Sequence, residues 1–490
     1  ACDETGTDTG TGDTGDTDTD TDTDTDTDTD TDTDTDTDTD TDTDTDTDTD
    51  ADMYAFTGRT GESSVAYDGQ TFRHLLIVDM KAHIGDLTDR LNTGYFPVSG
   101  DVADELDFYF NFDSTTSGTV DVAYETDPAS LQSIYDEVSS GKKLADKVAG
   151  NDPTGQHEDW TTEFAGWNDV DVTTPESLVR LWFADLDSAA VAWSNGDIPL
   201  GPDGTPVDYV YLTSTGLDYQ QLLQKFLTGS IAFSQGADDY LDDDVAGNGL
   251  LSSHAAVVTD KPYTALEHAW DEGFGYFGAS LDYCSGDDAI VASPGYADTV
   301  VVDGAVDLLT EVCWGHSTNA AKRDLGSNVG APTDFTATAW DAFVGGRALL
   351  ASTTTDLSPD ELAQLQGFRD EAVSAWEGAV AATVVSYINV VLQQMNMFET
   401  DEYDFAAHAK AWSELKGFAL TFQFNPRSPL TDEQFVMLHE LVGDAPVLST
   451  AGDADIAAYK AALLEARGML GTAYGFDPLN LGADDGTGGR

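Results

Sequence analysis

Hydrophobic residues recur every three or four positions through long parts of this chain, the spacing of amphipathic α-helices. Leu222, Leu223, Phe226 and Leu227 follow it, and the strings "SPDE" and "TDEQ" are typical helix N-termini. The pattern therefore predicts a mainly α protein built of helical bundles. The predicted helices span about residues 70–84, 174–193, 218–243, 358–397, 404–424, 431–443 and 454–470.

Residues 86–175 lack this regularity. They are rich in Gly, Ser, Asp and aromatic residues, and their mixed periodicity predicts an irregular N-terminal region that is partly β or without regular structure. We expect a helical domain over residues 53–480, with a division into halves of about 53–255 and 256–480, and a disordered C-terminus over residues 481–490.

Threonine and aspartate alternate without interruption from residue 17 to residue 50. Such a segment offers almost nothing to bury and places a charge at every second position, so the entropy lost on ordering it would not be offset. Residues 1–52 are accordingly predicted to be a disordered acidic linker.

The chain is strongly acidic, with 92 Asp and Glu against 20 Lys and Arg. The first 52 residues hold 23 of the acids and none of the bases, which leaves a formal charge of −49 on the rest of the chain. Such a surface repels nucleic acid and anionic membranes. The partners that such a surface favours are cations and basic molecules. No run of about 18 apolar residues occurs, so no transmembrane helix is predicted.

Three cysteines are present. Cys2 follows a small residue, as at the end of a trimmed bacterial lipobox, and predicts a lipid anchor and an exported cell-envelope location (periplasm or cell surface). The alternative is an unmodified thiol. Cys284 and Cys313 remain as one disulfide pair or as two buried free thiols.

The stretch "EHAWDEGFGYFG", residues 267–278, concentrates polar and apolar groups on one predicted helix. Its apolar side chains fall in one stripe, which predicts a core-facing side. Its polar side chains lie opposite, where a histidine and a carboxylate four residues apart can share a divalent metal ion, of iron, calcium or zinc, or can be ordinary solvated residues. The stripe consists of Leu266, Trp270, Phe274 and Phe277, and the predicted metal ligands are Glu267, His268, Asp271 and Glu272.

Bases are so scarce that each is expected to neutralise buried carboxylates between helices. The segment 408–424 contains two of these bases, Lys410 and Lys416, and is the expected partner of the polar face of 267–278. A lone histidine on its apolar face is more often a hydrogen-bonded core residue than a ligand. The predicted polar-network residues are His408, Lys410, Glu414, Lys416, Arg73, Lys322, Arg323 and Arg347.

The acidic loop "DDDVAGNG", which begins at Asp242, resembles part of a calcium loop. An EF-hand fails here, because Ala246 takes the fifth position and Ser253 takes the twelfth, where a bidentate glutamate is needed. A looser calcium site is the remaining interpretation.

Several strings together resemble an uncharacterised family of bacterial exported lipoproteins that is similar to the imelysins. They are "SSVAYDGQTFRHLL", "YLDDD", "YTALEHAWDEGFGYFGA", "AAKRDLG", "GGRALL" and "HAKAWSELKGFALTFQFNPRSPL". The resemblance implies two antiparallel helical bundles, an envelope location and an association with iron acquisition. It also implies a metallopeptidase motif, Gly-x-His-x-x-Glu, from which this chain departs because Leu266 replaces the glycine and Asp271 the glutamate.

Two functions follow. The first is a tethered, non-enzymatic binding protein for a metal ion, a metal complex or a protein partner. The second is a metal-dependent peptidase with His268 and nearby acids as ligands and Glu272 as general base. Neither His-Glu-x-x-His nor Gly-x-Ser-x-Gly occurs in the chain.

Overall fold

The computed structural model describes residues 53–152, 156–283, 288–292 and 304–489. These residues form helices and loops, and the described part contains no β-strand, only isolated bridges such as Thr57 with Ser63. The mainly α prediction is confirmed. The irregular region contains short helices in place of β structure.

In the first half, a helix begins close to its predicted position if a capping residue defines its start. Thr174 caps α5 through its side chain, as the motif before Pro175 predicts. The elements are α1 (Asp68–Asn92), α2 (Asp101–Phe110), α3 (Ser114–Ser117), α4 (Tyr135–Val138), η1 (Ala145–Lys147), α5 (Pro175–Ser194), α6 (Tyr219–Leu227), η2 (Thr228–Phe233), η3 (Gly236–Tyr240) and η4 (Gly249–Leu251).

The segment predicted as one helix over 218–243 is α-helical only as far as Leu227. It continues as two π-helical turns, η2 and η3. Its side chains are buried nearly all round, including Asp238 and Asp239. The apolar spacing therefore predicted a helix correctly but not the change of hydrogen-bond pattern.

The second half is almost wholly helical. Its elements are α7 (Ala265–Phe277), α8 (Asp288–Val291), α9 (Gly315–Leu325), α10 (Phe335–Ser352), α11 (Pro359–Asn396), α12 (Phe405–Ala419), η6 (Leu420–Phe424), α13 (Asp432–Val442), α14 (Asp453–Ala473) and η7 (Pro478–Asn480).

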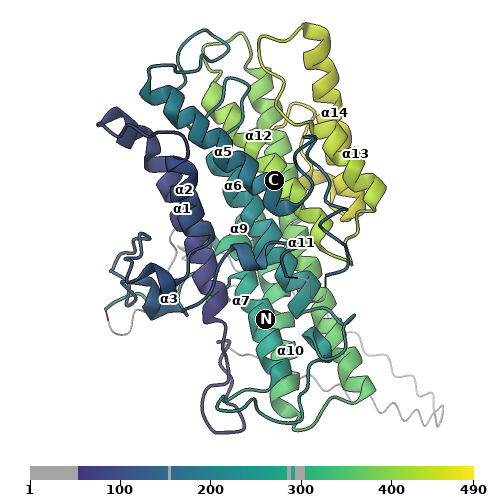
Figure 1. The fold of residues 1–490 in the computed structure, drawn as a ribbon. Helices are drawn as coiled ribbons and strands as arrows, with labels where there is room; N and C mark the ends of the chain where they lie inside the picture. The colour runs from purple at the N-terminus through teal and green to yellow at the C-terminus, as the bar shows by residue number, and fades with distance from the viewer. Residues whose placement is uncertain (1–52, 153–155, 284–287, 293–303, 490) are drawn as a thin grey trace, which may run out of the picture. The chain divides into compact units, whose positions relative to one another are not determined.

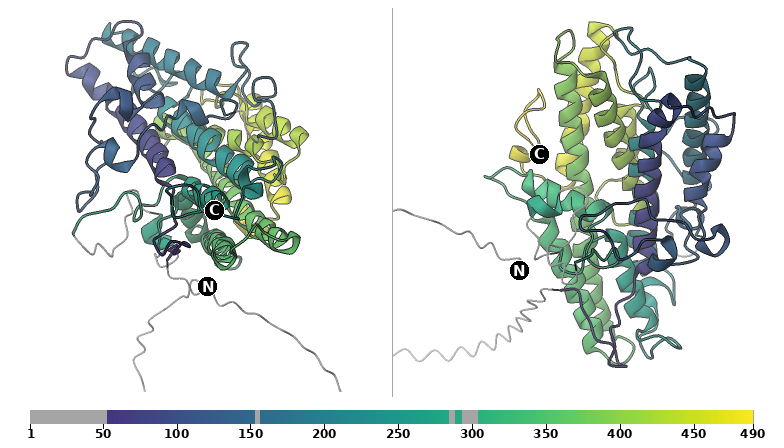
Figure 2. Two further views of the ribbon diagram at one scale, coloured as in Figure 1. Left: turned by 60° about the horizontal axis from the view of Figure 1, so that its bottom comes forward. Right: turned by 90° about the vertical axis from the view of Figure 1, so that its left-hand side faces the viewer.

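Helix α11 is the central element, against which α9, α10, α12 and α14 pack (Figure 1). It contains an 18-residue window of mean hydropathy 1.4, long and apolar enough for a membrane span, but 83% of that window is buried within the protein. A core helix meets the same criterion, so this is weak evidence for a span. Helix α1 (purple) lies alongside the segment that carries α6 (Figures 1 and 2).

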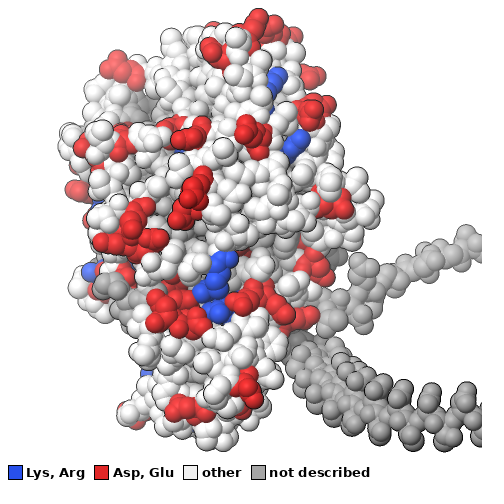
Figure 3. Space-filling view, turned by 90° about the vertical axis from the view of Figure 1, so that its right-hand side faces the viewer, with Lys and Arg blue, Asp and Glu red and all other residues white. Residues whose placement is uncertain are grey.

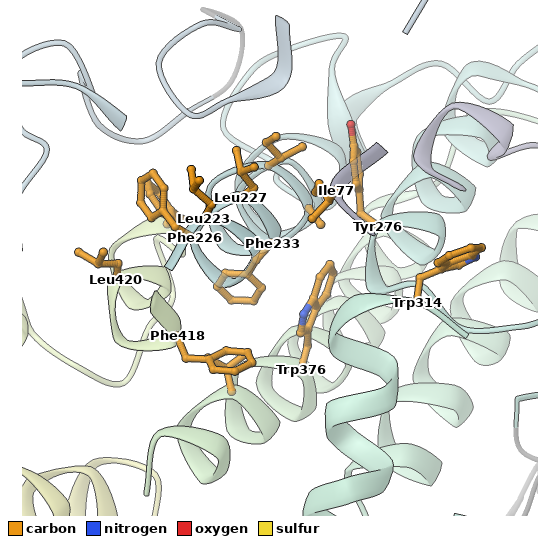
Figure 4. Packing of buried hydrophobic residues seen from close by; sticks show 14 of the residues in the cluster. Ile77, Leu223, Phe226, Leu227, Phe233, Tyr276, Trp314, Trp376, Phe418 and Leu420 are labelled. Carbon is orange, nitrogen blue, oxygen red and sulfur yellow. The ribbon is translucent and has the colours of Figure 1, made fainter. Parts of the chain in front are cut away.

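Large aromatic side chains fill the space where α11, α12 and η2 meet. Phe233, Trp376 and Phe418 point toward one another there (Figure 4). The rings of Phe233 and Trp376 lie 5.2 Å apart, edge to face, and Trp376 Nε1 donates to His316 Nδ1 at 2.7 Å. Helices from both predicted halves thus share one core.

Residues 481–489 differ from the predicted disorder. Asn389 Nδ2 donates to Leu481 O at 3.0 Å, and Gln393 Nε2 donates to Gly486 O at 2.6 Å. Arg467 donates to Ala483 O at 2.8 Å. Side chains of α11 and α14 therefore hold this segment, whose own composition gave no sign of a partner.

Candidate functional site

Helix α7 has the buried stripe that the sequence predicts. Leu266, Trp270, Phe274 and Phe277 are each at most 1% exposed. Thr264 accepts from Glu267 N at 3.1 Å, and Glu267 Oε2 accepts from Thr264 N at 2.7 Å, which completes a capping box.

One polar face of α7 is closed by an arginine. Arg347 of α10, fully buried, donates through Nε to Asp271 Oδ1 at 2.8 Å and through a terminal nitrogen to Glu267 Oε1 at 3.2 Å. Its other terminal nitrogen donates to Ser64 Oγ at 2.6 Å, and Tyr54 donates to Asp271 at 2.8 Å. Burial raises the pKa of Asp271 to about 6 even beside this cation.

This arrangement corrects the expected partner helix. The group that covers the polar face of α7 is Arg347 of α10, not a residue of segment 408–424. The predicted close approach at the α7 glycines is made by side chains: a Cβ at Gly275 would lie 2.6 Å from Tyr67 Cβ, and one at Gly273 would lie 2.6 Å from Leu241 Cγ.

His268 and Glu272 lie on a second, partly exposed face of the same helix. Glu272 accepts from Gln70 Nε2 at 2.9 Å, and His268 Nδ1 donates to Ala66 O at 3.0 Å. His268 Nε2 is 3.7 Å from Glu272 Oε1. The four predicted metal ligands are therefore divided between two faces.

In the described residues, no group of three or more His, Cys, Asp or Glu side chains is arranged to hold a metal ion. The acidic loop that begins at Asp242 was expected to bind calcium, but its carboxylates are paired with arginines. Asp242 pairs with Arg427, and Asp243 pairs with Arg369.

Two other predicted network residues, Arg73 and Lys416, have separate local partners. Arg73 donates to the carbonyls of Lys143 and Gly69. Lys416 donates to Gly443 O at 2.7 Å and to Asp444 at 3.1 Å, and burial lowers its pKa to about 8.

His408 is a core histidine, as the lone position on an apolar face suggests. Its Nδ1 lies 3.2 Å from the Tyr403 hydroxyl. Burial lowers its pKa to about 4.

The remaining predicted network residues gather at one place, and two lysines that the sequence analysis missed join them. We call these five bases the cationic cluster. They come from α1, α6, α9 and α12. Lys225 pairs with Glu414, and the charge of Glu414 also acts on Lys81, Lys322 and Arg323. The cationic cluster is Lys81, Lys225, Lys322, Arg323 and Lys410.

Packing of α6 on α12 brings the first pair together. Lys225 Nζ lies 3.5 Å from Glu414 Oε1 and 5.4 Å from the centre of the Phe418 ring. A Cβ at Gly417 would lie only 2.7 Å from Lys225 Cβ, so the close contact of the two helices depends on that glycine.

The other four bases have no such partner. Within the described residues, no hydrogen bond or ion pair engages the side chains of Lys81, Lys322, Arg323 or Lys410, and Arg323 Nε is buried. Burial and the charge of Lys225 lower the pKa of Lys81 to about 7. The pKa of Lys322 is lowered by the same two causes.

Three carboxylates lie near the cationic cluster, and all of them have other roles. Glu414 interacts with Lys225 and with the Tyr387 hydroxyl. Asp218 caps α6 by accepting from Gln221 N at 3.1 Å, and burial raises its pKa to about 6. Asp324, whose charge acts on Arg323, accepts from the backbone nitrogens of Phe335 and Thr336. Five bases against three carboxylates leave a local excess of positive charge.

This excess contrasts with the rest of the molecule. On the face shown in Figure 3, Asp and Glu side chains are spread over the surface while Lys and Arg are few. The cationic cluster holds a quarter of the chain's 20 Lys and Arg. Lys410 is exposed, and the other four bases are partly buried.

The cysteine predictions fall partly outside the described residues. Cys2 and Cys284 both lie outside the described residues. Cys313 is buried, and its Sγ donates to Ser280 Oγ at 3.3 Å. The predicted pairing of Cys284 with Cys313 stays a prediction.

Residues 51–293 match the family model described as Domain of unknown function (DUF4856). A DUF4856 domain covers these residues. It includes α7, Lys81 and Lys225, whereas Lys322, Arg323 and Lys410 follow it in the chain. The comparisons with curated proteins and with solved structures gave no match.

Proposed function

We propose that this chain is a non-enzymatic binding protein whose ligand is a small, multiply charged oxyanion held at the cationic cluster. The observation that carries this proposal is the grouping of five bases whose charges act on one another or on Glu414, with four of them lacking a protein acceptor in the described structure. Half-buried cations without partners reduce the stability of the fold. A bound anion would offset that cost.

The chemistry of the cluster favours an oxyanion over a bare metal ion. Lysine and arginine are donors without acceptor atoms, so they bind carboxylate, sulfate or phosphate oxygens. Among the ligands that the sequence suggests, a metal carried in an anionic complex fits this site, and an association with iron acquisition would use it in that form. The envelope location and the lipid anchor at Cys2 belong to the same proposal.

The peptidase alternative has less support. It needs His268 and nearby acids to share a metal, yet Arg347 occupies Glu267 and Asp271. A cation at those carboxylates would have to displace a buried arginine, which costs several kcal/mol.

The test is calorimetric titration of the full chain with sulfate and with citrate, the latter with and without one equivalent of ferric ion. We expect one binding site per chain, no comparable heat with chloride at equal ionic strength, and a loss of affinity of about tenfold in Lys81→Gln or Lys322→Gln, which is about 1.4 kcal/mol.

The matched control is Lys261→Gln, which removes the same charge from an exposed lysine. It should bind as the unmodified chain does. Removing an unpartnered cation should also raise the melting temperature measured without anion. Unchanged affinity in both cluster variants would show that the cluster is not the binding site.

A further inference from the structure

A cavity whose lining includes none of the cluster residues lies beside α11. Its volume is about 810 Å³. Its lining comes from the start of α10, the middle of α11, the loop 425–429 and the end of α14.

Glu377 forms the polar centre of this cavity. It is the only charged residue between Glu371 and Glu399, in the most apolar part of α11, and it is 1% exposed. Its carboxylate accepts from Ser428 Oγ at 2.6 Å, from the Tyr474 hydroxyl at 2.5 Å and from Asn425 Nδ2. Burial raises its pKa above the ordinary value, although these three donors act in the opposite direction.

The charge of the lining is negative. Asp334, Asp370 and Glu371 stand at the exposed rim. Arg427 is the base of the lining, but it is paired with Asp242 and donates to Ala237 O. Asp370 is paired with Arg369, and the described structure shows no ion pair for the other two rim acids. Glu377 has no ion pair either, although the charge of Arg427 acts to lower its pKa.

The remaining walls are apolar or aromatic. Phe335 lies against Gly378, where a Cβ would be 2.8 Å from its ring, and Val373 and Pro429 are further apolar lining residues. The rings of Tyr474 and Phe476 lie 5.8 Å apart and nearly parallel. Aromatic faces beside a carboxylate are the usual surroundings of a bound organic cation.

We propose that this cavity binds a small organic ammonium ion, with its nitrogen toward Glu377 and its apolar body against Phe335 and Phe476. The carboxylate supplies the charge partner. The apolar walls select a ligand with a hydrocarbon portion over a fully hydrated inorganic cation. This site is independent of the cationic cluster, because the two take ligands of opposite charge.

The test uses two probes of nearly equal size, phenethylammonium and its neutral analogue 2-phenylethanol, titrated into the full chain in about 150 mM salt to screen the acidic surface. We expect one phenethylammonium per chain and at least tenfold weaker binding of the alcohol. Glu377→Gln should weaken the ammonium at least tenfold and leave the alcohol unchanged. Glu440→Gln, at an exposed position on α13, is the matched control and should change neither.

A second variant covers the case in which Glu377→Gln fails to fold. Ala473→Trp fills the cavity wall while keeping Glu377 and its three donors, and it should abolish binding of the ammonium. Equal affinity for both probes, or unchanged ammonium binding in Ala473→Trp, overturns the proposal. Sulfate binding measured on the same variants should not change, which keeps this test separate from that of the cationic cluster.

Discussion

Lys225 Nζ of α6 lies 3.5 Å from Glu414 Oε1 of α12, and Lys225 is the cluster base that has an ion-pair partner in the described structure. Its side chain is 15% exposed and that of Glu414 is 8% exposed. Because few carboxylates face the bases of the cluster, the charge of Lys81, whose pKa is lowered to about 7, should depend on pH and on bound anions.

Sulfate affinity should fall as the pH rises from 6.5 to 8. The pKa of Lys81 is lowered to about 7, so this lysine loses its charge in that range. We expect about fivefold weaker binding at pH 8, from the loss of one nearby charge in a partly exposed site. Sulfate itself does not titrate there. Calorimetry at both pH values measures the effect.

The control for this prediction is Lys81→Gln, in which the pH dependence should disappear. Asp218, with a pKa of about 6, is ionised over most of the range and adds only a small change of the same sign.

Without anion, the unfolded chain binds the Lys81 proton more tightly than the folded chain. This lysine therefore contributes an increase in the free energy of unfolding between about pH 7 and the ordinary value of 10.5.

Arg347→Met should destabilise the protein by about 3–5 kcal/mol, since it leaves Glu267 and Asp271 buried without their cation. Urea unfolding measures the change. The triple variant Arg347→Met, Glu267→Gln, Asp271→Asn removes all three charges and should recover part of the loss. If the triple variant is less stable than the single one, the carboxylates do not depend on Arg347.

Gly346→Ala should cost about 1–3 kcal/mol, because its Cβ would lie 2.1 Å from Trp270 Cζ2 in a closely packed core. Gly367→Ala on α11 is the matched control, with nothing within 4 Å of the added atom. It should stabilise the helix by about 0.5–1 kcal/mol. Thermal unfolding measures both variants. Equal shifts of the two melting temperatures would contradict the packing argument.

Thr264→Ala should destabilise more than Thr431→Ala, although both remove the side chain of a capping box. Thr264 is buried and its Oγ1 also lies 2.8 Å from His254 Nδ1, so its loss leaves a buried imidazole nitrogen without that partner. We expect about 2–3 kcal/mol for Thr264 and about 1 kcal/mol for the exposed Thr431. Equal losses in chemical denaturation would mean that the contact with His254 contributes nothing.

The candidate sites could be predicted only in part. The scarcity of bases drew attention to Lys322, Arg323 and Lys410, but the expected pairing of these bases with buried carboxylates stays a prediction. Lys81 and Lys225 were missed, although each is a base within a helix whose neighbouring positions are apolar. Glu377 was also missed, and its signal was plain: it is the single charged residue between Glu371 and Glu399.

The sequence by itself determined where helices begin and which side of each is buried. Caps such as Ser358 and the spacing of Leu266, Trp270, Phe274 and Phe277 are local, so they act within a few residues along the chain. The tertiary structure alone decided which polar side chains meet. Helical periodicity gives the direction in which a residue points but not the element that faces it. For that reason Glu267 could be placed on a polar face, while its partner Arg347, 80 residues away, could not be identified. The same holds for Lys81 and Lys410, which come from opposite ends of the described chain and meet only because α1 packs on α6 and α6 on α12.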